Sequence, residues 1–396
     1  MSLDALLSDE GWPYASSGAG RFHCLFGRDS LITALQVLPA RPEVARAVLD
    51  ALAARQGTRF DPLTLEEPGK IGHEFRETPP PSFVAAGWPP GGPFAYYGTA
   101  DATSWFLVLC GALAECSDAA RAAAGWLAGA LAAGGGLVRH VPGEFGLGQQ
   151  GWRDTIDAAA DDNGGGFLRA DGTNPAPPLA DIDTQAVTVA ALRAVFRLTG
   201  DPAWARRLEA LRERLSALPV ETMAVEAGPA AKPGGASPVC DAGGPPPAAG
   251  EVVVPGAGSH LGWLLWAGAA IDPGPVAERL CQPDLFTDFG LRTLSSADPN
   301  FRPDAYHRGS VWPFDSWLGW GGLRAAGFAA EAERVRVGVL AALDRLGSPH
   351  ELYAVDGGVA PIASSNAVQA WTVGARIAFE AGWDGILSDS RRADAG

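Results

Sequence analysis

The stretch DIDTQAVTVAALRAVFRLTGDPAWARRLEALRERLSAL, residues 181–218, decides the fold of this chain. Apolar residues recur at helical spacing in both of its halves, and the halves meet at Gly200, Asp201 and Pro202. Glycine is preferred just after a helix, aspartate caps the start of the next one, and proline fits a first helical turn. The stretch therefore predicts two helices, 181–199 and 201–218, joined by a very short turn.

The same pattern of two helices and a short turn repeats along the chain. We expect four further pairs and one closing helix, at residues 29–38 with 42–55, 101–116 with 118–133, 259–270 with 273–281, 311–326 with 329–346, and 366–381. Residues 4–9 or the segment around Thr155 are candidates for a twelfth helix. Long glycine-rich segments with aromatic and charged residues separate the pairs, and only residues 251–254 give a good strand signal.

Paired helices whose long connections all lie on one side are typical of a toroid of hairpins. We therefore predict an all-α fold, an (α/α)6 toroid whose long loops line a pocket at one end. No shift in composition marks a domain boundary, so residues 1–396 are expected to form a single catalytic domain.

The charge of the chain excludes several classes of partner. The formal net charge is −15, from 30 Lys and Arg against 45 Asp and Glu, which argues against nucleic acid and against an anionic membrane surface. The N-terminus is acidic without a signal-peptide pattern, and the most apolar run, 261–271, is too short to span a bilayer. We therefore expect a cytoplasmic protein.

The cysteine and tryptophan residues indicate which kinds of site the chain can form. The five cysteines form no CxxC pair and no metal-ligand spacing is present, so we expect neither a metal nor a cofactor. The 13 tryptophans are an unusually large share. Flat indole faces suit sugar rings, although most of these side chains are expected to fill the core.

Two carboxylic acids are candidates for acid–base chemistry. The segment Gly148–Asp157, GQQGWRDTID, places Asp154 close to Trp152 in a glycine-flanked stretch. An aromatic, desolvating wall raises the pKa of a carboxyl group, as a general acid requires. Glu351, in the tetrapeptide HELY at 350–353, is the candidate for a second carboxyl group across a pocket.

Six motifs that carry polar and aromatic residues occur in order along the chain. They are FGRDSLITALQVL (26–38), EEPGKIGHE (66–74), YYGTADAT (96–103), QGWRDTIDA (150–158), YHRGSVWP (306–313) and SSNAVQAW (364–371). In this order they resemble the amylo-α-1,6-glucosidase family of glycogen-debranching type, which is grouped with the (α/α)6 inverting glycosidases. Relatives of that kind often carry a separate N-terminal β domain, which we expect this chain to lack.

The resemblance implies roles for residues of five of these motifs and for Glu351, which precedes the final helix. Asp154 would be the general acid and Glu351 the general base, with Asp157 as the alternative acid and Glu144 as a further candidate. Arg28 and Asp29 would bind the sugar in the innermost subsite, although a helix N-cap is an equal alternative for Asp29. Other implied substrate-binding residues are Tyr97, Asp101, Trp152, His307 and Arg308, with Glu67 and Lys70 behind them and Trp312 either as an apolar wall or as packing.

The expected reaction is inverting, exo-acting hydrolysis of an α-glucoside. One carboxyl group protonates the glycosidic oxygen, while the other deprotonates a water on the opposite face of the ring, which places the two about 6.5–9.5 Å apart. The substrate would be an oligosaccharide from glycogen or starch, or alternatively a small glycoside such as a disaccharide or a glucosyl- or mannosylglycerate. A sugar epimerase that uses paired histidines and a catalytically silent carbohydrate-binding protein are the remaining alternatives.

Overall fold

The computed structural model describes residues 2–18, 20–154, 166–227 and 250–386. Every one of the eleven predicted helices is present in it. The first members of the pairs and the closing helix are α1 (Gly27–Val37), α4 (Ala102–Ala112), α6 (Ile182–Thr199), α8 (His260–Trp266), α10 (Pro313–Ala325) and α12 (Ala370–Ala381). The second members are α2 (Pro42–Ala53), α5 (Asp118–Ala133), α7 (Pro202–Ser216), α9 (Pro273–Leu280) and α11 (Ala329–Leu346).

The turn between α6 and α7 has the glycine end cap and the aspartate start cap that the sequence predicts. Gly200 ends α6 in the left-handed conformation, at a φ of 69°, which glycine adopts without steric cost. Asp201 then caps α7 by accepting the N–H of Ala203 at 2.8 Å. Asp29 is not a cap, because α1 begins at Gly27 and Asp29 lies within its first turn.

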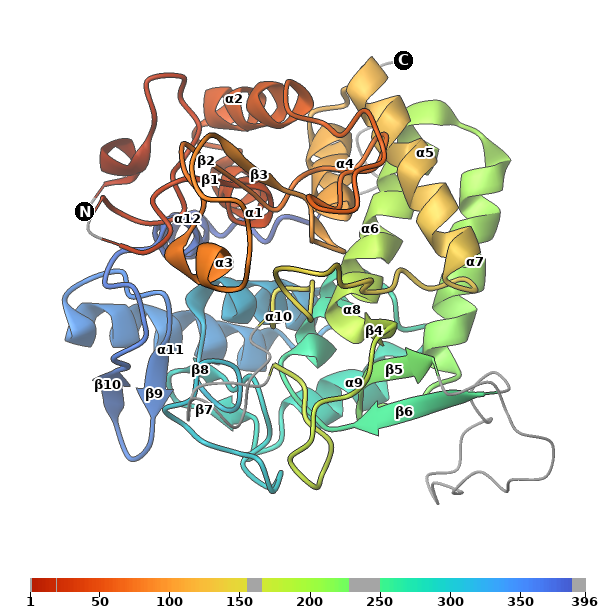
Figure 1. Cartoon of the computed structure of the whole chain (residues 1–396). Coiled ribbons are helices and arrows are strands. Elements are labelled where there is room, and N and C mark those ends of the chain that lie inside the picture. The colour runs from red at the N-terminus through yellow and green to blue at the C-terminus, as the bar shows by residue number, and fades with distance from the viewer. Residues whose placement is uncertain (1, 19, 155–165, 228–249, 387–396) are drawn as a thin grey trace, which may run out of the picture.

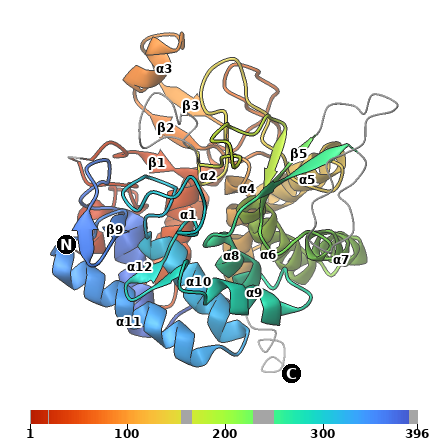
Figure 2. The ribbon, with the colours of Figure 1, turned by 90° about the horizontal axis from the view of Figure 1, so that it is seen from below.

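The first members of the pairs form a closed inner ring. Each of α1, α4, α6, α8, α10 and α12 packs against the next, and α12 packs against α1. The second members, α2, α5, α7, α9 and α11, each pack against the outside of their own partners, and Figure 2 shows α7, α9 and α11 along the periphery. The predicted (α/α)6 toroid is therefore confirmed.

Close packing in the ring depends on glycine and on large aromatic side chains. A Cβ atom on Gly262 of α8 would lie only 2.6 Å from the Cα atom of Gly319 in α10, and one on Gly322 of α10 would lie 2.5 Å from the carbonyl oxygen of Gly262, so this close approach needs glycine on both helices. Trp105 and Trp263 are fully buried in the main core, and their rings meet edge to face at a centroid distance of 5.7 Å. Tryptophan therefore supplies much of the core volume, as expected.

The loops contain more regular structure than the sequence predicts. The predicted strand signal at 251–254 is confirmed by β6 (Glu251–Pro255), but nine further short strands and a one-turn helix, α3 (Pro81–Ala85), also occur in the described residues. Antiparallel pairing joins β1 (Leu25–Phe26), β2 (Glu74–Arg76) and β3 (Phe94–Tyr96), and likewise β4 (Leu179–Asp181), β5 (Thr222–Ala227) and β6. Two small hairpins consist of β7 (Phe286–Thr287) with β8 (Gly290–Leu291) and of β9 (Tyr353–Val355) with β10 (Val359–Pro361). Most of these strands have two or three residues, too few for an alternating pattern to show.

The small sheets stand at the edges of the helical ring. Figure 1 shows the β5–β6 hairpin at the periphery, and Figure 2 shows α3, β2 and β3 projecting on the side opposite α11. The candidate twelfth helix near the N-terminus is a 3₁₀ helix, Leu3–Leu6, and the segment around Thr155 lies outside the described residues. Within the part of the chain that the structure describes, no helix is long and apolar enough to cross a membrane.

Candidate active site

A cavity of about 750 Å³ is lined by residues from loops and helix starts that lie far apart in the chain. Its volume is in the range of sites that enclose a small molecule. Half of the twelve predicted site residues line it, namely Arg28, Asp29, Trp152, Asp154, Trp312 and Glu351. The closed ring therefore brings the two candidate catalytic carboxyl groups to one cavity.

Asp154 is held from one side by an arginine of α1. The Nη1 atom of Arg28 lies 3.4 Å from Asp154 Oδ2, while Nε and Nη2 of the same guanidinium contact Asp101 at 2.6 and 3.0 Å. Asp154 keeps 24% of its side chain exposed, and Asp101 is almost fully buried. Burial raises the pKa of Asp154 to about 6, against the opposing charge of Arg28.

Glu351 is held by three hydrogen-bond donors and is buried. The hydroxyl of Tyr306 donates to Oε1 at 2.6 Å. The backbone N–H and the side-chain amide of Asn366 donate to Oε2 at 3.1 and 3.0 Å. Burial raises the pKa of Glu351 to about 7, and the donors oppose that rise because they favour the ionised form.

A hydrogen-bonded chain connects Glu351 with Asp29. The Asn366 amide also donates to Gln369 Oε1 at 3.2 Å, and the Gln369 amide donates to Asp29 Oδ1 at 3.1 Å. Burial, together with the negative charges of Glu351 and Asp154, raises the pKa of Asp29 to about 8, although Arg28 opposes the shift. At neutral pH the Asp29 carboxyl is therefore largely protonated and can donate a hydrogen bond to a ligand.

Aromatic rings form the wall beside Asp154. Trp152 stacks on Trp263 with ring centroids 5.9 Å apart and meets Trp312 edge to face at 5.4 Å. Behind this wall, His307 stacks on Trp312 at 5.2 Å, and its Nε2 lies 4.0 Å from Asp154 Oδ1. Burial holds the pKa of His307 well below its usual range, so the ring is neutral and forms no ion pair with Asp154.

The remaining predicted residues lie outside the cavity lining. Lys70 and Glu67 pair with each other at 3.1 Å, and the Tyr97 hydroxyl donates to the carbonyl of Arg55 at 2.7 Å. Arg308 is likewise absent from the lining. The cavity geometry therefore gives no support to substrate contact by Glu67, Lys70, Tyr97 or Arg308, and Asp101 contacts Arg28 outside the lining.

Several residues of the site are not among the predicted ones. His73 and Glu74 end the motif EEPGKIGHE and line the cavity, as do Tyr306 and Trp371. Asn366 and Gln369 lie in SSNAVQAW and position Glu351 and Asp29 through the contacts given above. The motifs contained the signal, but nothing in the sequence shows which of their side chains turn inward.

Two further candidates for the acid have different outcomes. Asp157 lies outside the described residues. Glu144 is exposed and is not part of the cavity lining.

Within the described ranges, no group of three or more His, Cys, Asp or Glu residues could hold a metal ion.

Comparison with known proteins finds one matching family model and several similar structures. Residues 184–358 match the family model described as the mannosylglycerate hydrolase MGH1-like glycoside hydrolase domain, and no curated protein matches. The structure is similar to that of the GH63 mannosylglycerate hydrolase from Thermus thermophilus in complex with Tris and D-glycerate, with a TM-score of 0.64 and 18% identity over 95% of this chain and 97% of that one. The same hydrolase in complex with glucose gives a TM-score of 0.63 and 18% identity over 96% and 98%. A structure described as a wild-type glycosidase gives 0.54 and 14% over 97% and 95%.

The fold is thus that of the (α/α)6 glycosidases, and the family match confirms the prediction that this chain is a glycoside hydrolase. The matching model is the one for mannosylglycerate-hydrolase-like domains. The comparisons support a glycosidase but do not extend to the narrower resemblance to glycogen-debranching amylo-α-1,6-glucosidases.

Proposed function

We propose that this chain hydrolyses small α-glycosides with inversion of the anomeric centre, with Asp154 as general acid and Glu351 as general base. The observation that carries the proposal is that both carboxyl groups line one cavity in different surroundings. Glu351 accepts three hydrogen bonds that orient it and oppose the rise of its pKa to about 7, whereas Asp154, with its pKa raised to about 6, lies beside an aromatic wall. Because the pKa of the base lies above that of the acid, the active form, with Glu351 ionised and Asp154 protonated, is the minor one of the two singly protonated forms.

In this mechanism Asp154 donates its proton to the glycosidic oxygen as the bond to the anomeric carbon breaks. Glu351 removes a proton from the water that attacks the opposite face, and Asp29, with Arg28 beside it, binds sugar hydroxyls. Correctly placed proton transfers of this kind contribute about 10²–10⁴-fold each. The hydrolase then returns to its starting state by exchanging one proton between the two carboxyl groups and solvent.

The substrate we propose is a sugar linked to a small acid such as glycerate, in preference to an oligosaccharide from glycogen or starch. The matching domain model and the structures in complex with D-glycerate or glucose support this choice. The acid part of such a substrate carries a carboxylate, which a cationic side chain in the cavity can bind. Arg76 pairs with Glu74 at 2.8 Å, whereas Arg21 has no carboxylate partner within the described residues and donates to the carbonyl of Ser364 at 2.6 Å.

An epimerase has less support. Such an enzyme would need two histidines facing its substrate, and among the described residues only His73 lines the cavity. His307 lies behind Trp312, and His260 is completely buried in α8.

The experiment is a panel of glucosyl- and mannosylglycerates, α-linked disaccharides and short α-1,6-branched oligosaccharides, followed by proton NMR of the first product formed. We expect turnover of a glycosylglycerate with release of the β-anomer of the sugar. Asp154→Asn should reduce this turnover about 10²–10⁴-fold, and Asp157→Asn tests the alternative acid. Release of the α-anomer, or an Asp154→Asn variant as active as the wild type, would refute the assignment.

A further inference from the structure

Among the described side chains, Arg28 is the one that donates a hydrogen bond to Asp154, at 3.4 Å, so the loop that carries Asp154 matters for its position. We propose that the N-cap and first turn of α6, residues 181–185, act as a clamp on residues 138–154, here called the acid loop. His140, Arg153, Asp181 and Asp183 are then positioning residues for the general acid. This inference rests on the proposed function, since it assigns the clamp a role in protonating the leaving group.

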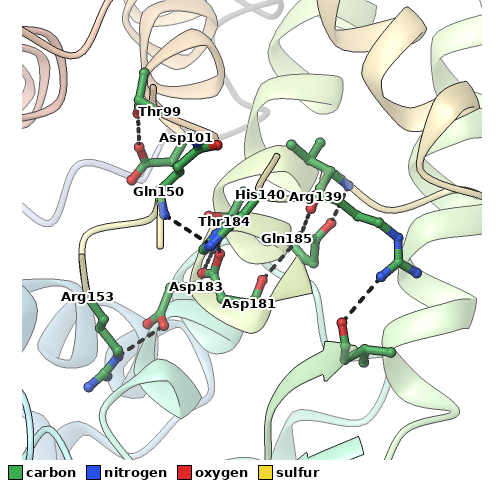
Figure 3. Close-up of polar contacts among 12 residues, drawn as sticks. Thr99, Asp101, Arg139, His140, Gln150, Arg153, Asp181, Asp183, Thr184 and Gln185 are labelled. Atoms are coloured by element: carbon green, nitrogen blue, oxygen red, sulfur yellow. Dashed lines mark hydrogen bonds and ion pairs between the residues drawn. The ribbon is translucent and has the colours of Figure 1, made fainter. Parts of the chain in front are cut away.

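The first anchor of the clamp is His140, labelled in Figure 3, and its side chain is completely buried. Its Nδ1 accepts the backbone N–H of Gln150 at 3.0 Å, so the ring proton is on Nε2 and points to Asp181 Oδ2 at 2.5 Å. The other oxygen of Asp181 accepts the N–H of Thr184 at 2.7 Å and caps α6. One carboxylate thus caps the helix and, through the His140 ring, holds both ends of the segment 140–150 of the acid loop.

The second anchor is Arg153, the residue directly before Asp154. Its guanidinium is completely buried and donates to Asp183 Oδ2 at 3.2 Å, to the carbonyl of Thr293 at 3.0 Å and to Ser259 Oγ at 2.9 Å. The guanidinium carbon also lies 4.4 Å from the centre of the Trp152 ring. Figure 3 shows Arg153 reaching from the loop toward Asp183 on α6. Arg153 therefore fixes the backbone on which both the aromatic wall and the acid are built.

A third anchor closes the clamp at the start of the acid loop. Gln185 accepts the N–H of Val138 at 2.9 Å and donates to its carbonyl at 2.8 Å. The Gln150 side chain makes a similar pair of bonds, both at 3.1 Å, with the backbone of Val141. The acid loop is thus held at three points by one helical turn, and rigid support of this kind matters because a shift of about 1 Å in a catalytic group can reduce a rate about 10²-fold.

The test uses the nearly isosteric variant Asp181→Asn, which replaces one acceptor with a donor. An asparagine cannot both cap Thr184 and accept from His140, so one contact is lost. We expect kcat for an unactivated glycoside to fall about 10- to 100-fold with KM within about threefold. Hydrolysis of the matching glycosyl fluoride should fall less than about threefold, because fluoride leaves with little need for a proton donor.

The matched control is Asp201→Asn, which alters the N-cap of α7 in the same way but far from the cavity. It should change neither substrate's rate by more than about twofold. Equal losses of Asp181→Asn on both substrates, or no loss on either, would overturn the proposal, because a merely structural role does not distinguish leaving groups.

Hydrogen exchange provides a readout that needs no turnover. In Asp181→Asn the amides of 138–150 should exchange faster, while α10 and α12 keep the exchange rates of the wild type. Unchanged exchange in the acid loop, or faster exchange throughout the molecule, would overturn the clamp whichever residue proves to be the acid. Equal activity of Asp154→Asn and the wild type would instead refute the proposed function.

Discussion

The surroundings of Glu351 and of Asp154 show two ways of fixing a carboxyl group in one cavity. Glu351 is oriented through its own oxygens, which accept from Tyr306 and Asn366. Within the described part of the chain, the side-chain donor to Asp154 is Arg28, at the longer distance of 3.4 Å, and we propose that the backbone before Asp154 supplies the rest of its support. Several donors fix the direction of a carboxylate toward the water that it deprotonates, whereas a carboxyl group with fewer donors depends on its backbone for its position. The following predictions test this difference, from the largest expected effect to the smallest.

Glu351→Gln and Asp154→Asn should both reduce kcat by about 10²–10⁴-fold on an unactivated glycoside. Their responses to the leaving group should differ, because only the acid protonates it. With a glycosyl fluoride, Asp154→Asn should recover most of its activity while Glu351→Gln stays impaired. Steady-state kinetics on both substrates measure this, and equal recovery of the two variants would contradict the assigned roles.

The pH dependence of kcat/KM should be bell-shaped. Activity requires Glu351 ionised and Asp154 protonated, and their pKa values are raised to about 7 and about 6. Acid pH protonates Glu351 and alkaline pH ionises Asp154, so the optimum should lie between about pH 6 and 7, where the form with Glu351 ionised and Asp154 protonated is a minor one. Activity should fall about tenfold per pH unit on either side. A profile that stays flat down to pH 4 would show that no buried base is involved.

Tyr306→Phe should affect the base selectively. Loss of a donor to a charged acceptor is worth about 1.5 kcal/mol, so kcat/KM should fall about tenfold. The pKa of Glu351 should rise further, because the lost bond favoured the ionised form, and the acidic limb of the pH profile should move to higher pH. Tyr353→Phe is the control, since its buried hydroxyl donates to the carbonyl of Phe289, outside the cavity lining. An unmoved acidic limb in Tyr306→Phe would count against the hydrogen bond to Glu351.

Asp29→Asn should stabilise the protein while weakening catalysis. Burial raises the folded-state pKa of Asp29 to about 8, so folding loses stability as the pH rises from about 4 to about 8. Asparagine removes this penalty and still accepts from Gln369. We expect a gain of about 1–2 kcal/mol in the free energy of unfolding at pH 8 and a smaller gain at pH 5, measured by urea denaturation. A gain that is the same at both pH values would show that the Asp29 charge is not its source.

The sequence predicts the features that neighbouring residues determine, and it does not predict contacts that only the complete fold creates. The helix pairs are predictable because local residues such as Gly200, Asp201 and Pro202 determine where helices end. Asp154 stands in a motif that resembles that of a known group of enzymes, and the same resemblance implies a base at Glu351, before the last helix. The partners of Glu351 are not predictable in this way, because Tyr306 lies 45 positions before it and only the fold brings the two together. Conversely, Lys70 lies in a motif but pairs with Glu67 outside the cavity lining.

The contact between Gln369 and Asp29 spans 340 positions of sequence and joins the N-cap of α12 to α1. During synthesis, the ribosome must release nearly all of the described chain before this bond can form. The sugar pocket therefore cannot exist on a nascent chain that lacks α12, and closing such a distant contact is a slow step for a polypeptide. Catalytic competence should appear late in folding and all at once, when the final helix docks.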